Sequence, residues 1–247
     1  GSGRCADGEL CGRYSGRRCT GTFLCREIWM ETGALSHKII VVGIGPGDPA
    51  YLLPKARKII EDARIIVGGK RALADYAHDG VRACAIGADI PAVLAFIQDG
   101  LAEDNVVVMV SGDPGYYSLL DALRRTFSIA QIDVVPGISS LQLAFARLAL
   151  PWHAARLLSF HGREPQAEEL FRAPGAVLGM LTDGRNNSQT IAVRLLACGW
   201  RENDRMYVCT RLSYEDEKII EMTLGAAKDD TGIGHGVIIV CTHEEDT

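Results

Sequence analysis

The chain has 247 residues, of which 47% are hydrophobic and 23% are charged. These proportions are typical of a globular protein and exclude a disordered or fibrous chain. The formal net charge of −5 argues against nucleic-acid binding, which usually needs a basic surface. No apolar run is long enough to cross a bilayer, and the first residues lack the apolar core of a secretory signal. We therefore expect a cytoplasmic protein without a membrane contact.

The first part of the chain differs from the rest in composition. Residues 1–36 hold four of the eight cysteines, and these form no C-x-x-C pair and have no histidine close by. Such spacing argues against zinc, and we expect no metal site in the protein. We interpret residues 1–36 as an N-terminal extension that is disordered or non-native, with Met30 as a candidate natural start.

From residue 38 onward, short apolar runs alternate with segments whose apolar residues recur at helical spacing. The strands expected in the first half are 38–42, 65–67, 81–86, 105–110 and 131–135. The helices expected between and after them are 52–60, 91–101, 116–125 and one that Ser139 opens in a capping box with Gln142. This alternation predicts a mainly parallel sheet with helices on both faces.

The pattern restarts near residue 150. Strands are expected at 156–160, 176–181 and 205–210, with a helix over 188–198. Two last strands, 218–224 and 237–241, leave little room for a helix between them, which predicts a mixed sheet. We therefore predict an α/β protein with two α/β domains, residues 37–150 and 151–247, and a ligand cleft between them.

The first motif, Val42-Gly43-Ile44-Gly45-Pro46-Gly47-Asp48, follows the first expected strand. Glycines at this place allow a tight turn and a close ligand. A dinucleotide site is disfavoured, because the third glycine of its pattern is replaced by Asp48 and the second strand ends without an acidic residue. Taken alone, the segment indicates a tight turn at least as well as a ligand loop.

The second motif, Ser111-Gly112-Asp113-Pro114-Gly115-Tyr116-Tyr117-Ser118, follows the most apolar strand. Ligands of open parallel sheets bind at the carboxyl ends of strands. Because no phosphate loop is present, a nucleoside-like ligand without phosphates fits best. A Pro-Gly turn in which Asp113 caps a helix explains the segment equally well.

The third motif, Val135-Pro136-Gly137-Ile138-Ser139-Ser140, has a structural explanation in the helix cap of Ser139. Taken in order, the three motifs resemble the tetrapyrrole methylase family, the class III S-adenosylmethionine-dependent methyltransferases. The resemblance covers residues 38–241 and implies S-adenosyl-L-methionine as methyl donor and S-adenosyl-L-homocysteine as product. The implied donor contacts are Pro46, Ser111, Gly112, Asp113, Tyr116, Ser139, Ser140, Met180 or Leu181, and Leu212.

Four further segments, 67–71, 159–163, 182–187 and 212–217, look like the family members that methylate carbon 5 of precorrin-7 or its cobalt form in cobalamin biosynthesis. In some organisms that activity is fused to a decarboxylating methyltransferase acting at carbon 15. The resemblance implies the carbon-5 activity alone in this chain, a homodimer, and a possible partner enzyme that acts at carbon 15.

The implied substrate is a small-molecule tetrapyrrole, an apolar macrocycle with several ionised carboxylates. Guanidinium groups bind carboxylates in a bidentate manner, and loops at strand ends would present them. The candidate substrate contacts are Gly45, Lys70, Arg71, His161, Arg163 and Arg185. For each charged side chain, a solvated surface position is an equally good explanation.

The implied chemistry is methyl transfer from a sulfonium to a ring carbon, followed by loss of a proton. Related uroporphyrinogen methylases carry an aspartate at the end of the second strand, where this chain has Gly68-Gly69. His161 is the remaining candidate for a catalytic base, although a substrate contact is its first interpretation.

Three alternative functions stay open at this point. The first is another class III methyltransferase, which would act on a different tetrapyrrole position, on diphthamide or on ribosomal RNA. The others are a nicotinamide-dependent oxidoreductase and a non-catalytic nucleotide-binding module.

Overall fold

The computed structural model describes residues 37–243, which belong to one compact unit. The extension expected over residues 1–36 lies outside the described residues, as do the last four residues of the second expected domain. Within residues 37–243, no helix is both long and apolar enough to span a membrane.

The first sheet is parallel throughout, as the alternation of strands and helices predicts. Its strands follow the order β3-β2-β4-β1-β5. Their bounds are β1 (Ile39–Gly43), β2 (Ile65–Gly68), β3 (Arg82–Ala85), β4 (Val106–Val110) and β5 (Ile132–Val135). β1 and β4 lie inside the sheet and are covered on both faces, which explains their unbroken apolar sequences.

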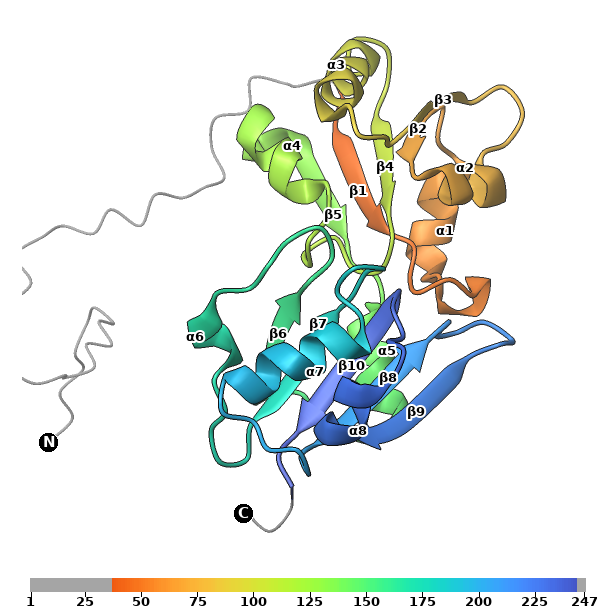
Figure 1. Ribbon diagram of the computed structural model, residues 1–247. Helices are drawn as coiled ribbons and strands as arrows, with labels where there is room; N and C mark the ends of the chain where they lie inside the picture. Colours follow the sequence, from red (N-terminus) through yellow and green to blue (C-terminus); the bar gives the residue numbers. More distant parts are fainter. Residues whose placement is uncertain (1–36, 244–247) are drawn as a thin grey trace, which may run out of the picture. The chain divides into compact units, whose positions relative to one another are not determined.

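Helices cover both faces of this sheet (Figure 1). α3 and α4 pack on the face that carries Val41 and Val108, whereas α1 and α2 pack on the face of Val42 and Val107. The helix bounds are α1 (Pro54–Glu61), α2 (Lys70–Tyr76), α3 (Ile90–Gly100) and α4 (Leu120–Thr126), with short 3-10 helices η1 (Pro49–Tyr51) and η2 (Ile129–Gln131). The expected arrangement of helices around a parallel sheet is confirmed.

Two helices of this half differ from the sequence prediction. α2 follows Gly69 directly without a side-chain cap, and no helix is predicted there. α4 begins at Leu120 rather than at Tyr116, because Tyr117 has a φ of 50° in the left-handed region and interrupts the helical backbone.

The second sheet is mixed, as predicted, with strand order β6-β7-β10-β8-β9. Only β6 and β7 pair in parallel, and the other neighbours are antiparallel. The bounds are β6 (Arg156–Ser159), β7 (Val177–Leu181), β8 (Arg205–Thr210), β9 (Lys218–Thr223) and β10 (Gly236–Cys241). The helices α6 (Ala167–Leu170), α7 (Ser188–Ala197) and α8 (Leu224–Asp229) pack on one of its faces.

The prediction of little room for a helix between the last two strands is wrong. α8 starts directly after β9, where the Thr223 side chain accepts a hydrogen bond from the Ala226 N–H. Leu224 and Ala227 are fully buried against the sheet. A helix of six residues thus fits between the two strands, although the sequence shows no long amphipathic pattern there.

α5 (Ser140–Arg147) covers the other face of the second sheet, although it precedes residue 150 (Figure 1). The capping box of Ser139 and Gln142 is present as predicted. Gly179 lets the helix approach closely, since a Cβ atom there would lie 2.8 Å from Cε2 of Phe145. The division into domains 37–150 and 151–247 stays a prediction, and this helix packs across it.

Candidate functional site

The carboxyl ends of β1, β4 and β5 meet in direct backbone contact. A Cβ atom on Gly43 would lie 2.6 Å from the carbonyl oxygen of Gly112, and one on Gly137 would collide with the same oxygen. Gly45 and Gly112 also form an isolated bridge, in which the Gly112 N–H donates to the Gly45 carbonyl at 2.9 Å. Gly43 and Gly137 are therefore required by the mutual packing of the loops.

Asp113 joins the second motif to the third. Its Oδ1 accepts a hydrogen bond from the Gly115 N–H at 2.8 Å, and its Oδ2 accepts one from the Gly137 N–H at 3.1 Å. The interpretation of Asp113 as a helix cap is wrong, because α4 begins only at Leu120 and has no side-chain cap. The turn itself is present, and the carboxylate shapes two loops at once.

These loops form one wall of a cavity of about 580 Å³, and the second sheet forms the facing wall. Most of the residues singled out from the sequence lie in its lining. They are Pro46, Arg71, Ser111, Gly112, Asp113, Tyr116, Ser139, Ser140, His161, Leu181 and Leu212. The wall from the first sheet is polar, whereas Leu181 and Leu212 belong to an apolar cluster on the facing wall.

Met180, a candidate donor contact, and Gly45, a candidate substrate contact, lie outside the lining of the cavity because of the backbone at each position. Successive side chains of β7 point to opposite faces, so Leu181 faces the cavity while Met180 is fully buried beneath α7. Gly45 is engaged in its bridge to Gly112.

Three of the candidate cations also lie outside the lining. Lys70 is exposed at the start of α2. The guanidinium of Arg163 lies 4.1 Å from the ring centroid of Tyr117, which does line the cavity. The backbone N–H of Arg185 donates to Asp183, and its side chain is absent from the lining.

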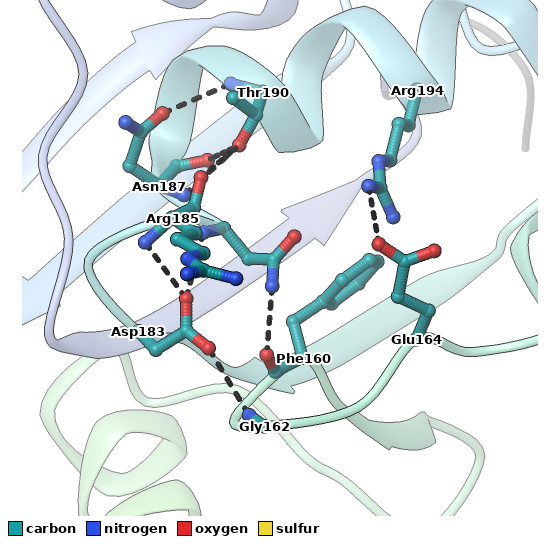
Figure 2. A network of polar contacts seen from close by, with 9 residues as sticks. Phe160, Gly162, Glu164, Asp183, Arg185, Asn187, Thr190 and Arg194 are labelled. Atoms are coloured by element: carbon teal, nitrogen blue, oxygen red, sulfur yellow. Dashed lines mark hydrogen bonds and ion pairs between the residues drawn. The ribbon is translucent and has the colours of Figure 1, made fainter.

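The loop that carries His161 is held by a carboxylate on the neighbouring strand end (Figure 2). Asp183 accepts backbone hydrogen bonds from Asn186 at 2.8 Å, Gly162 at 3.1 Å and Arg185 at 2.9 Å. These bonds, with that from Asn186 the strongest, hold the pKa of the Asp183 carboxyl far below its usual range.

Two further contacts support the same loop. The Asn186 side chain donates to the Phe160 carbonyl at 3.0 Å, and Glu164 pairs with Arg194 at 2.9 Å (Figure 2). His161 is thereby placed at the cavity, with its Nδ1 3.4 Å from the Thr182 carbonyl oxygen.

The two walls are joined by hydrogen bonds between the halves of the chain. The Tyr116 hydroxyl donates to the Leu158 carbonyl of β6 at 2.6 Å, and burial raises the pKa of this phenol. The backbone N–H of Asp48 donates to the Ser213 hydroxyl at 3.0 Å. Tyr116 thus holds the walls together as well as lining the cavity.

The structure adds residues to the lining that sequence reasoning does not select. They are Tyr117, Thr182, Cys209, Arg211, Tyr214, His235, Gly236 and Val237. Most lie at strand ends of the mixed sheet, where the rule for parallel strand ends does not apply. Tyr214 lies within the segment 212–217 quoted for the resemblance, so a signal for it exists.

Cys209 is the one sulfur nucleophile in this lining. It is fully buried, and burial raises the pKa of its thiol to about 12. The thiol therefore stays protonated near neutral pH and contributes packing to the apolar wall. Among residues 37–243, no group of three or more His, Cys, Asp or Glu side chains is placed to hold a metal ion.

Comparison with known sequences shows that the chain is similar to tetrapyrrole methylases. A family described as Tetrapyrrole (Corrin/Porphyrin) Methylases matches residues 38–228. The cobalt-precorrin-7 C(5)-methyltransferase of Salmonella typhimurium is 33% identical over 201 residues, which cover 81% of this chain and 98% of that protein.

Solved structures show the same fold. The precorrin-6Y methylase of Archaeoglobus fulgidus superposes with a TM-score of 0.65 and 26% identity, covering 84% of this chain and 99% of that one. The uroporphyrin-III C-methyltransferase of Thermus thermophilus, in its complex with S-adenosylhomocysteine, gives 0.63 and 23% identity over 82% and 91% of the chains. From the family match and the close relative together, the chain belongs to the tetrapyrrole (corrin/porphyrin) methylase family.

Proposed function

We propose that this protein transfers a methyl group from S-adenosylmethionine to carbon 5 of precorrin-7, or of its cobalt form, in cobalamin biosynthesis. One observation carries the proposal. Three strand-end motifs and the facing residues of the second sheet line a single cavity, in a chain 33% identical to a cobalt-precorrin-7 C(5)-methyltransferase.

The lining of the cavity fits the methyl donor. A nucleoside that carries an amino acid needs an apolar wall for its base and polar groups for its charged end. Leu181, Leu212 and Val237 supply the apolar wall, while the hydroxyls of Ser111 and Ser140 supply polar groups opposite. When bound, the donor provides a methyl group on a sulfonium whose leaving group is neutral.

The residues of this chain act mainly by positioning. In-line transfer needs the ring carbon and the methyl group held close together, which the fixed loops around Asp113 and Asp183 provide. The new carbon–carbon bond replaces the sulfur–methyl bond, and the ring then loses a proton. We assign His161 first to substrate contact and second to accepting that proton, because it lines the cavity.

The deciding experiment follows the methyl group. The full chain is incubated with a donor labelled with ¹³C in its methyl group and, separately, with precorrin-7, cobalt-precorrin-7 and earlier corrin precursors. NMR is expected to place the label on carbon 5, and the better substrate reveals whether cobalt is required. A label on another ring carbon would assign the chain to a different position within the family.

Binding of the free ligands provides an independent test. S-adenosylhomocysteine is expected to bind in the micromolar range, and NADH is expected not to bind. The reverse result would favour an oxidoreductase and contradict the methyltransferase assignment.

We extend the proposal to the cellular setting. Free thiols at Cys84, Cys198, Cys209 and Cys241 support a reducing compartment, the cytoplasm. A homodimer is proposed from the family relationship, and light scattering coupled to gel filtration tests it. A partner enzyme that acts at carbon 15 is proposed from the family relationship, since the Salmonella relative is named for carbon 5 alone.

A further inference from the structure

Two arginines from different halves of the chain lie over the ring of one tyrosine of the cavity, Tyr214. The guanidinium carbon of Arg71, in α2, lies 5.2 Å from the ring centroid of Tyr214. That of Arg211, just after β8, lies 4.3 Å from the same centroid. All three side chains line the cavity.

Each guanidinium leaves its terminal nitrogens available. Arg71 meets Asp75 through Nε at 3.7 Å, and Arg211 meets Asp216 through Nε at 3.0 Å. Among the described residues 37–243, the Nη atoms of both arginines have no hydrogen-bond partner. The end of each guanidinium, where the two Nη atoms can pair with both oxygens of a carboxylate, is therefore open.

The ring of Tyr214 is held in place by its packing against Gly47. Gly47 lies against the phenol, so that a Cβ atom at this glycine would collide with the hydroxyl. The hydroxyl is buried and has no hydrogen-bond partner within the described part of the chain. Because it is covered, the ring rather than the hydroxyl is the part of Tyr214 that the cavity uses.

The loop that presents Arg211 and Tyr214 has an energetically unfavourable backbone conformation. Arg211 and Ser213 have φ values of 54° and 72°, which L-residues rarely adopt. The Ser213 N–H donates to Glu217 at 2.7 Å, and its hydroxyl accepts from Asp48 at 3.0 Å. Strain that neighbouring bonds maintain in this way is typical of binding and catalytic loops.

We propose that Arg71, Arg211 and the ring of Tyr214 form a cation clamp that binds peripheral carboxylates of the tetrapyrrole. The clamp rests on the proposed function, since it requires a carboxylated macrocycle. Two cations beside one ring repel each other, and bound carboxylates would remove that repulsion while pairing with the open guanidinium edges. Since each half contributes one arginine, the substrate would also hold the two walls together.

The test uses cobyrinic acid, a stable corrin with free carboxylates, and its methyl ester as an uncharged control. Isothermal titration of the full chain is expected to show binding of the acid but not of the ester. Arg71→Gln and Arg211→Gln are each expected to raise the Kd for the acid about tenfold or more. Arg211→Lys should restore part of this loss, and the salt dependence of binding should be weaker in the Gln variants.

Three further variants separate the clamp from general effects. Arg82→Gln is the matched control, because Arg82 also lies over an aromatic ring, Phe96, and pairs with carboxylates, but outside the cavity lining. Its Kd should equal that of the wild type. Tyr214→Phe should keep the affinity, whereas Tyr214→Leu, which removes the aromatic ring, should lower it.

The binding of S-adenosylhomocysteine distinguishes the possible failures. Wild-type affinity for the acid in both Gln variants, or equal binding of acid and ester, would overturn the clamp and leave the proposed function intact. A parallel loss of S-adenosylhomocysteine binding in both variants would also overturn it, because the arginines would then maintain the cavity only. A wild-type chain that binds S-adenosylhomocysteine but no corrin acid would contradict the proposed substrate and the clamp together.

Discussion

At the scale of single residues, Asp113 combines a place at the ligand cavity with a structural role in the turn, which the sequence presents as alternatives. It lines the cavity, its Oδ1 holds the turn of the second motif through Gly115, and its Oδ2 ties this motif to the third through Gly137. A carboxylate that accepts backbone N–H groups makes charge-assisted hydrogen bonds, which are stronger than neutral ones. The residue is thus expected to affect the methyl donor through the shape of the loops as well as through any direct contact.

Asp113→Ala is predicted to raise the Kd for S-adenosylhomocysteine about tenfold, because both loop bonds are lost. Asp113→Asn, which keeps one acceptor oxygen, should have an intermediate Kd. Isothermal titration measures both Kd values, and Asp121→Asn, at an exposed position of α4, is the control that leaves the Kd unchanged. An unaltered Kd in Asp113→Ala would remove this residue from the donor site.

The lowered pKa of the Asp183 carboxyl predicts that the stability of the protein depends on pH. Its folded-state pKa lies below the unfolded value, which is about 3.9 for an aspartate. The carboxylate therefore contributes stability that is complete above the unfolded pKa and is lost as the pH falls toward the folded pKa.

Asp183→Asn should accordingly be less stable than the wild type at pH 7 and at pH 5, by the same amount. The difference in free energy of unfolding should shrink below about pH 4, where the Asp183 carboxylate of the unfolded wild-type chain takes up a proton while that of the folded chain stays ionised. Urea denaturation at pH 7, 5 and 3 measures it. A difference that grows as the pH falls would mean that the pKa is raised rather than lowered.

At the scale of secondary-structure elements, the two sheets illustrate different degrees of predictability. β1 and β4 are apolar along their whole lengths, so burial on both faces follows from their sequences alone. α8 is short and shows no extended period, and it is stabilised by its packing against the second sheet together with the cap from Thr223. α5 has a clear cap, but its sequence does not indicate which sheet it covers.

A substitution of Gly179 tests the packing of α5 on the second sheet. In Gly179→Ala the new methyl group would lie 2.8 Å from Phe145, and the free energy of unfolding should fall by about 1–3 kcal/mol. Urea denaturation measures the change, and Phe145→Leu in the same chain should restore part of it.

Gly87→Ala is the matched control, because a Cβ atom there meets no other atom within 4 Å. It should change the free energy of unfolding by less than about 0.5 kcal/mol. Equal stability of Gly179→Ala and the wild type would contradict the close packing of α5 on β7.

At the scale of the whole molecule, the cavity depends on contacts between the two halves of the chain. Tyr116 reaches from the second motif to the backbone of β6, and Ser213 reaches from the second half to the loop of Asp48. These hydrogen bonds span residues far apart in sequence, so no local pattern predicts them.

Tyr116→Phe is predicted to lower the free energy of unfolding by about 1 kcal/mol, because the Leu158 carbonyl loses its donor from the other wall. Thermal and urea denaturation check this value. Tyr117→Phe is the control, because Tyr117 is exposed and its hydroxyl has no partner within residues 37–243. If both variants match the wild type, the hydrogen bond does not contribute to joining the walls.

The sequence by itself determined the parallel sheet, the mixed sheet and the place of the three motifs at neighbouring strand ends. Local features suffice for this, since apolar runs, glycine turns and helix caps each depend on a few consecutive residues. The position of Asp113 at the cavity follows from the same rule, because the carboxyl ends of parallel strands share one edge.

Only the tertiary structure decided which residues form the facing wall. It selected Leu181 over Met180, left Arg163 and Arg185 outside the lining, and brought Arg211, Tyr214 and His235 into it. The physical reason is that these positions depend on how the antiparallel strands of the second sheet face the first. That arrangement comes from the packing of α5 and from hydrogen bonds between distant residues, which no sequence period encodes.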